Sequence, residues 1–199
     1  MKNKIKIAIT GSIGSGKSEF CRIVEKYGFP VIRSDEISKN ILSNNENVKQ
    51  KLLNVFGDIV FKDGAPNTKY LAEIVFNDFE KLKQLEEILH PLVIEEIRIK
   101  SKELLKENNV VFIESALVYE ANIENEFDYV VLITAPRELR LKRKLDSGFN
   151  KEDFIKREKF QIPDTEKRKR ADFIFVNNKS IQNLEEFFKI ICLTLNIQY

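Results

Sequence analysis

The sequence contains very little histidine and cysteine. One histidine, His90, and two cysteines, Cys21 and Cys192, occur among 199 residues. This supply is too small for a Cys/His zinc site. The two cysteines lie far apart in the sequence, and each falls at an apolar position of an expected helix. We therefore expect buried, reduced thiols, a reducing environment and a cytoplasmic location.

Long apolar runs and a strong excess of one charge are missing as well. No run of about 18 apolar residues occurs, and the apolar part of the opening MKNKIKIAIT is short and ends at glycine. We expect no membrane partner. Lys and Arg number 33 against 31 Asp and Glu, a balance that neither requires nor excludes nucleic acid. Hydrophobic residues make up 43% of the chain, enough for one core, so we expect a single domain over residues 1–199.

Five short apolar runs are typical of buried strands. They alternate with helical patterns and lack a polar face, which predicts an α/β fold with a five-stranded parallel sheet covered on both sides. We expect the second strand to lie beside the first. The runs are Ile5–Thr10, Phe29–Ile32, Val110–Glu114, Tyr129–Thr134 and Phe173–Val176.

Two intervals between strands are longer than a simple crossover requires. Residues 36–109 carry apolar positions at helical spacing and predict an inserted lobe of four helices around the turn KDGAPN. One of these helices ends at His90-Pro91 and the next begins near Val93. Residues 146–170 are polar and highly charged, and they predict a mobile lid. Both segments belong to the same domain as the sheet.

The segment Gly11–Ser18, GSIGSGKS, matches the pattern G-x-x-x-x-G-K-[ST] between an expected strand and an expected helix. Glycines let backbone N–H groups turn inward around a phosphate, and the helix N-terminus adds partial positive charge. Lys17 is then placed to bridge the β- and γ-phosphates, and Ser18 to bind Mg²⁺. The plainer interpretation is a glycine-rich turn with an exposed lysine. We expect ATP and Mg²⁺ as cofactors.

Two acidic residues follow expected strands. Ligands of open α/β sheets bind beyond the carboxyl ends of the strands. Asp35 there could accept the proton of an acceptor hydroxyl or order the metal, or it could only cap the helix that begins at Glu36. Glu114 ends VVFIE like a Walker B acid, which holds Mg²⁺ through water, or it is a solvated strand end.

Missing motifs narrow the class of nucleotide-binding protein. A D-x-x-G motif after the third strand, an N-K-x-D motif and an L-S-G-G-Q-like signature do not occur, which argues against a GTPase or a transporter ATPase. A small kinase remains. A second hypothesis is a nucleotide-dependent RNA-binding or regulatory protein that uses residues 151–170, where 8 Lys/Arg face 5 Asp/Glu. That surplus also suits a solvated lid helix.

The chain closely resembles the dephospho-coenzyme A kinases, nearly from end to end. The matching segments include the phosphate loop and acceptor-lobe motifs that general nucleotide kinases do not share. They are TGSIGSGKS (10–18), VIRSD (31–35), FGD (56–58), LAEIVF (71–76), LHPL (89–92), ESALVYE (114–120), LKR (141–143), R-x-x-x-Q (157–161) and ADFIFVNN (171–178).

The resemblance implies ATP-dependent phosphorylation of the 3'-hydroxyl of dephospho-CoA, the last step of coenzyme A synthesis. It implies a P-loop NTPase-type three-layer core, a helical acceptor lobe at residues 36–109 and an ATP lid at residues 146–170. The expected partner is the small-molecule substrate, with no nucleic acid, and we expect a monomer or a weak homo-oligomer. A kinase for another nucleoside, nucleotide or sugar acceptor is the alternative.

The resemblance also assigns roles to individual residues. Lys17 and Asp35 become the catalytic residues, and Ser18 and Glu114 the metal site. His90, on residues alone a core or helix-end histidine, becomes a wall of the acceptor pocket. The ATP site comprises Gly11, Ile13, Gly14, Ser15, Gly16, Lys17, Ser18, Glu19 and Arg143; the acceptor site comprises Asp35, His90, Arg33 and Leu117; the lid contributes Arg157, Gln161 and Lys167.

The chain departs from the family pattern at four places. Arg33 replaces an aspartate, Thr68 stands where an arginine is usual, and Ala116 replaces a proline. The lid lacks an expected arginine near Asp146 and Ser147. These departures concern acceptor and lid contacts and leave the phosphate loop intact. Arg33 could take over binding of the acceptor phosphate.

Overall fold

A computed structural model describes residues 4–199. The chain divides into two compact units, one built from the segments up to Arg33 and from Lys100 onward, the other from Ser34–Ile99. Within the described residues, every helix is too short or too polar to cross a membrane.

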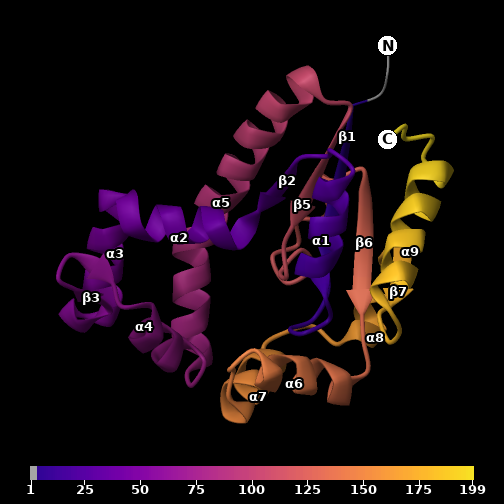
Figure 1. The fold of residues 1–199 in the computed structure, drawn as a ribbon. Coiled ribbons are helices and arrows are strands. Elements are labelled where there is room, and N and C mark those ends of the chain that lie inside the picture. The colour runs from indigo at the N-terminus through magenta and orange to yellow at the C-terminus, as the bar shows by residue number, and fades with distance from the viewer. Residues whose placement is uncertain (1–3) are drawn as a thin grey trace. The chain divides into compact units, whose positions relative to one another are not determined.

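The first unit is built on a parallel sheet of five strands, as the sequence predicts (Figure 1). The strand order is β2-β5-β1-β6-β7. The expectation that the second strand lies beside the first is wrong, because β5 pairs with both and separates them. The strands are β1 (Ile5–Thr10), β2 (Val31–Arg33), β5 (Val110–Glu114), β6 (Tyr129–Thr134) and β7 (Phe173–Val176).

Helices and apolar side chains cover this sheet. On one face α1 (Lys17–Lys26) and α9 (Ile181–Thr194) pack side by side, and Phe20 and Phe188 meet Phe112 of β5 in a single core. The ring centroids of Phe112 and Phe188 are 6.2 Å apart. Strand residues directed to the opposite face, such as Ile113 and Leu132, are also fully buried. Burial on both faces explains why the central strands lack a polar side. The edge strand β7 differs, because Ile174 and Val176 are exposed.

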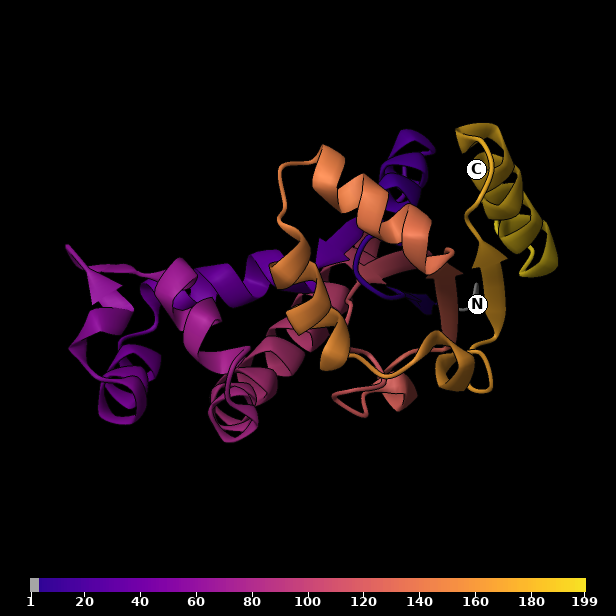
Figure 2. The ribbon, with the colours of Figure 1, turned by 90° about the horizontal axis from the view of Figure 1, so that it is seen from below.

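Three further helices lie near the carboxyl ends of the strands (Figure 2). They are α6 (Arg137–Asp146), α7 (Lys151–Lys159) and α8 (Asp164–Lys167), and a short 3-10 helix, Glu124–Glu126, precedes β6. α6 follows β6 directly, and α7 and α8 occupy the segment for which the sequence predicts a lid. This arrangement brings charged helices to the edge of the sheet at which its ligands would bind.

The second unit is helical and has its own core. It contains α2 (Ser34–Asn44), α3 (Glu46–Phe56), a 3-10 turn (Asp58–Val60), α4 (Thr68–Val75) and the first part of α5 (Phe79–Glu107). Apolar residues at helical spacing fill the centre, as the sequence pattern predicts. The core residues are Leu42, Val48, Leu52, Val60, Leu71, Val75 and Leu89.

One local expectation about this unit is wrong, and the expected turn at KDGAPN closes a hairpin that was not predicted. The chain does not break at His90-Pro91, since α5 continues through Pro91. A proline removes one helical hydrogen bond, and burial of Leu89 and Ile97 on either side offsets that loss. The turn around Asp63-Gly64 closes a small hairpin, β3 (Phe61–Lys62) with β4 (Ala65–Pro66). Both turn residues have positive φ, 53° and 78°, as a type I′ turn requires.

Candidate active site

The loop between β1 and α1 has the backbone of a phosphate cradle. Gly11 and Gly14 take φ values of 147° and 79°. A Cβ atom at Gly11 would lie 2.0 Å from the Ile133 carbonyl oxygen, and one at Gly14 would lie 2.6 Å from the Arg140 carbonyl oxygen. Only glycine fits at either position. The loop is therefore held against the end of β6 and the backbone of α6.

Two polar side chains of the loop, Lys17 and Ser15, could bind an anion. Lys17 Nζ donates to the carbonyl oxygens of Gly11 at 2.8 Å and Ser12 at 3.4 Å, so its ammonium folds back over the loop. Ser15 Oγ is buried without a hydrogen-bond partner in the described structure. A cationic lysine, an unpaired buried hydroxyl and a helix N-terminus together suit phosphate oxygens.

Side chains from α6 and from the segment after β7 support the outer side of the loop. Arg140 Nη1 donates to the Ile13 carbonyl at 3.2 Å, and Arg143 Nη1 donates to the Ser15 carbonyl at 3.2 Å. Asn177 Nδ2 donates to the same Ser15 oxygen at 2.9 Å. The structure places Arg143 at the loop, where the sequence predicts it. Sequence reasoning missed Arg140 and Asn177, although Asn177 lies in the ADFIFVNN segment.

Ser18 and Glu114 come together at the first turn of α1. Ser18 Oγ donates to Glu114 Oε1 at 2.8 Å, and the Glu114 side chain is only 13% exposed. This contact disfavours the interpretation of Glu114 as a solvated strand end. Burial, followed by the nearby Glu114 carboxylate, raises the pKa of the Cys21 thiol. That thiol is therefore neutral at physiological pH.

The donor set at Ser18 and Glu114 suits magnesium. A hydroxyl and a carboxylate are the hard oxygen ligands that Mg²⁺ takes, usually together with water and substrate phosphates. In residues 4–199 no group of three or more His, Cys, Asp or Glu side chains could hold a metal by itself. The residues fit a metal that arrives with a nucleotide better than a resident metal centre.

Two side chains from the predicted lid contact the phosphate loop. Gln161 Oε1 accepts the backbone N–H of Ile13 at 2.9 Å, and Asp164 Oδ1 accepts Ser12 Oγ at 2.6 Å. Gln161, which the sequence analysis names as a lid residue, contacts the phosphate loop. Asp164 makes a second contact that the sequence analysis did not predict. The polar pattern of the lid gives no signal that would have separated Asp164 from its charged neighbours.

The other two lid residues make different contacts. Lys167 is fully buried, with Nζ 2.7 Å from Glu120 Oε1. The same oxygen accepts the backbone N–H of Ile162 at 3.0 Å. In this arrangement Lys167 joins the lid to the turn after β5 and does not face the phosphate loop. The guanidinium of Arg157 lies 5.0 Å from the ring centroid of Phe149.

The expected acceptor residues are spread over both units. Asp35 is exposed in the first turn of α2, which begins one residue earlier at Ser34, so Asp35 is not the N-cap. His90 is half-buried in α5, and burial lowers the pKa of its imidazole. Leu117 lies in the turn after β5. Arg33 pairs with Glu25, and Glu19 pairs with Arg22.

Several basic residues of the run at 151–170 make contacts within the chain. Lys169 pairs with Glu166 at 2.8 Å, and Arg170 pairs with Glu124 and stacks on the Tyr119 ring at 4.6 Å from its centroid. Arg168 Nη2 donates to Thr134 Oγ1 at 2.8 Å. Such pairing fits a packed lid and gives no support to an RNA-binding surface.

A glycine loop lies between the central parallel strand and α1, with a lysine and a serine at its end and an acid on the neighbouring strand. These features define a P-loop nucleotide-binding protein. Residues 5–183 match the family model described as dephospho-CoA kinase. The chain belongs to that family, and the resemblance expected from the sequence is confirmed.

Individual relatives agree with the family match. A dephospho-CoA kinase of Thermus thermophilus is 36% identical over 196 residues, covering 98% of this chain and 93% of that protein. The solved structure of TT1252 from the same species has a TM-score of 0.81 at 35% identity, covering 98% and 99% of the two chains. A dephospho-CoA kinase structure from Campylobacter jejuni has a TM-score of 0.63 at 32% identity, covering 98% of each chain.

Proposed function

We propose that this protein transfers the γ-phosphoryl group of ATP to the 3'-hydroxyl of dephospho-CoA, giving coenzyme A and ADP. The observation that carries the proposal is the family match over residues 5–183, with relatives named dephospho-CoA kinase over nearly the full chain. The phosphate loop supports the proposal, because its backbone N–H groups and Lys17 could bind and position the phosphates of ATP.

The phosphate loop and its neighbours position the nucleotide. The backbone N–H groups of Gly14–Ser18 bind phosphate oxygens, and Lys17 exchanges its contacts with Gly11 and Ser12 for the phosphates. Ser18 holds Mg²⁺, with Glu114 holding it through water. Held by these two residues, Mg²⁺ would supply positive charge that offsets the charge developing on the transferred group.

Asp35 is the proposed base that orients the acceptor hydroxyl and takes its proton. Its carboxylate is exposed two residues after β2 and does not cap α2. His90 and Leu117 are proposed to line the acceptor site. Arg143, Arg157 and Gln161 act from the lid side, where exclusion of water prevents loss of ATP to hydrolysis.

The test is an ADP-release assay with MgATP. Dephospho-CoA is compared with AMP, adenosine and no acceptor. We expect release that depends on dephospho-CoA. Release that is independent of the acceptor, or that prefers another acceptor, would contradict the proposed substrate.

Asp35→Asn tests the proposed base. Without a carboxylate the hydroxyl proton has no acceptor, so we expect turnover to fall by about two to four orders of magnitude while ATP affinity is kept. Asp63→Asn, in the exposed turn of the β3–β4 hairpin, is the matched control and should be neutral. Equal turnover of the two variants would remove Asp35 from the mechanism.

A further inference from the structure

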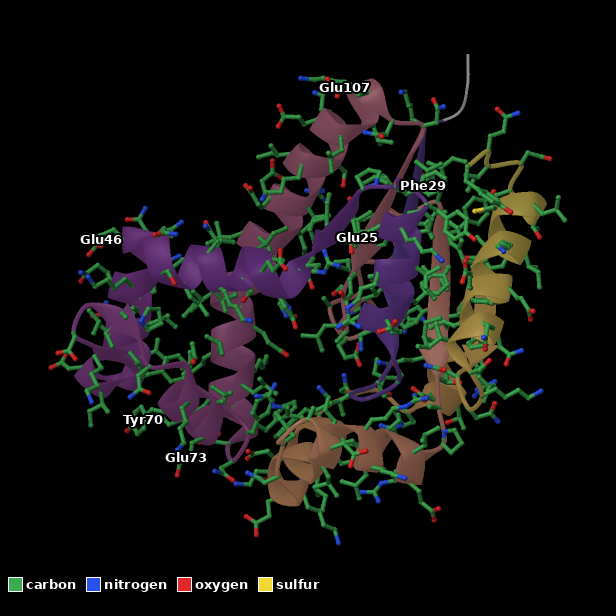
Figure 3. The ribbon with its side chains drawn as sticks, in the orientation of Figure 1. Glu25, Phe29, Glu46, Tyr70, Glu73 and Glu107 are labelled. Atoms are coloured by element: carbon green, nitrogen blue, oxygen red, sulfur yellow. The ribbon has the colours of Figure 1, made fainter. Side chains whose placement is uncertain are left out.

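A chain of charges lies at the carboxyl ends of β2 and β5. Arg33 ends β2, Glu114 ends β5, and the two residues are direct neighbours in the parallel register. Glu25 reaches this point from the last turns of α1 (Figure 3). Arg33 carries a fixed positive charge, and it stands next to the acid that the proposed mechanism assigns to Mg²⁺.

Glu25 takes the strong contacts of Arg33. The two Arg33 amino groups, Nη1 and Nη2, donate to the two Glu25 oxygens at 2.7 and 2.8 Å in a bidentate pair. Only Nε faces Glu114, 3.6 Å from Oε2, which is too long for a hydrogen bond. Hydrogen bonds from Arg33 also keep the pKa of Glu25 below its usual range.

Because Arg33 gives its hydrogen bonds to Glu25, the Glu114 carboxylate remains available to Ser18 and a metal ion. Its Oε1 accepts a hydrogen bond from Ser18 Oγ at 2.8 Å, and Arg33 reaches Oε2 only through the long 3.6 Å contact. The Cys21 thiol also donates to this carboxylate. A bidentate arginine contact is among the strongest that a carboxylate makes. If Glu25 did not hold the guanidinium, Glu114 would be the nearest alternative partner. A forked contact there would occupy its oxygens and place a cation beside the metal.

We propose that Glu25 is a positioning residue of the metal site: it retains Arg33 in a bidentate pair and so keeps the Glu114 carboxylate directed to Ser18 and Mg²⁺. The inference rests on the proposed function only in taking the metal to be the Mg²⁺ that accompanies a nucleotide. In the structure both amino groups of Arg33 are occupied by Glu25.

The competing explanation is an ordinary surface ion pair. Such pairs contribute little to stability and would not change how the protein responds to magnesium. A Mg²⁺ titration therefore separates the two explanations, and a melting curve alone would not.

The experiment measures binding of a fluorescent N-methylanthraniloyl-ATP to the full chain as free Mg²⁺ is varied. Four proteins are compared: wild type, Glu25→Gln, Arg33→Met and the double variant. Glu185→Gln is the control. Glu185 of α9 pairs at 3.2 Å with Lys26, which follows Glu25 in α1. Melting temperatures without nucleotide confirm that all are folded.

We expect Glu25→Gln to raise the half-saturating Mg²⁺ concentration roughly tenfold or more, the usual effect of disturbing an outer-shell partner of a metal site. Arg33→Met and Glu185→Gln should stay within about twofold of wild type. The double variant should match Arg33→Met, because the competing cation is gone.

Three results would overturn the inference. They are an unchanged Mg²⁺ requirement in Glu25→Gln, a double variant as impaired as Glu25→Gln, and wild-type binding that ignores Mg²⁺. Failure of the proposed function is seen separately, as normal Mg²⁺-dependent nucleotide binding without turnover of dephospho-CoA. That combination would leave the role of Glu25 intact.

Discussion

At the scale of single residues, the phosphate loop requires glycines, because a Cβ atom at Gly11 or Gly14 would collide with neighbouring backbone. Gly11 is needed because the Ile133 carbonyl occupies the space a side chain would fill, and Gly14 because the Arg140 backbone does so. Gly28 also has positive φ, 82°, but nothing lies within 4 Å of its missing Cβ. A substitution at Gly28 therefore measures the free-energy cost of backbone strain alone, whereas a substitution at Gly11 or Gly14 adds the cost of a steric collision.

Gly28→Ala should therefore cost only the strain of a left-handed alanine, about 1 to 2 kcal/mol. Gly11→Ala adds a collision with backbone that cannot yield, so we expect a larger loss of stability and at least a tenfold loss of ATP affinity. Chemical denaturation and nucleotide titration measure both. Equal effects of the two substitutions would contradict the close packing of the loop against β6.

Sequence reasoning can name residues whose chemistry is carried by a local pattern. Lys17, Ser18 and Glu114 follow from a motif or a strand end, and the structure brings Ser18 and Glu114 into contact. Arg140 and Asn177 were missed because their partners are distant in sequence. Glu25 was missed although Arg33 is only eight residues away, because the two lie on different elements, α1 and β2, and the spacing of the residues does not show that these meet. Lys167, expected as a lid residue, is buried in its pair with Glu120.

At the scale of elements, the lid is joined to the sheet by buried charge. Lys167 is 0% exposed and Glu120 8% exposed, with Nζ and Oε1 2.7 Å apart. Because Glu120 also accepts the Ile162 N–H, one carboxylate joins both ends of the segment from Ile162 to Lys167 to the turn after β5.

Lys167→Met should destabilise the protein by about 3 to 5 kcal/mol, because it leaves the Glu120 charge buried and unpaired. Lys169→Met is the control, since its pair with Glu166 is exposed and contributes about 0 to 1 kcal/mol. Denaturant unfolding measures both. A loss below about 1 kcal/mol for Lys167→Met would show that the pair is hydrated in solution.

α5 carries the only histidine of the sequence. Because burial lowers the pKa of His90 in the folded protein, the unfolded chain binds the proton first as the pH falls. Stability associated with neutral His90 is therefore full above the unfolded pKa of about 6.5 and is lost as the pH drops below it.

His90→Gln removes this titration. We expect the melting temperature to fall less between about pH 7.5 and pH 5.5 in the variant than in wild type, since carboxylates contribute equally to both. Thermal melts at the two pH values test this. Parallel pH dependence would mean that the imidazole is hydrated in the folded state.

At the scale of the whole molecule, the chain forms two units, each with its own core. Four of the five strand positions were predictable because apolar runs without a polar side indicate buried strands. The second strand, expected over Phe29–Ile32, begins at Val31 and ends at Arg33. The continuity of α5 through Pro91 and the β3–β4 hairpin were not predicted, because tertiary packing outweighs a proline and a two-residue turn gives a weak signal. The strand order was predicted incorrectly, because no local sequence pattern shows that β5 lies between β1 and β2.

The central claim is that the protein phosphorylates the 3'-hydroxyl of dephospho-CoA. The most direct test identifies the product of dephospho-CoA and MgATP by phosphorus NMR and mass spectrometry. We predict one 3'-phosphorylated coenzyme A per ADP with the wild type, and loss of at least about two orders of magnitude in rate with a folded Lys17→Ala variant. Phosphate in place of coenzyme A, a different phosphorylated position, or full activity of Lys17→Ala would contradict the account.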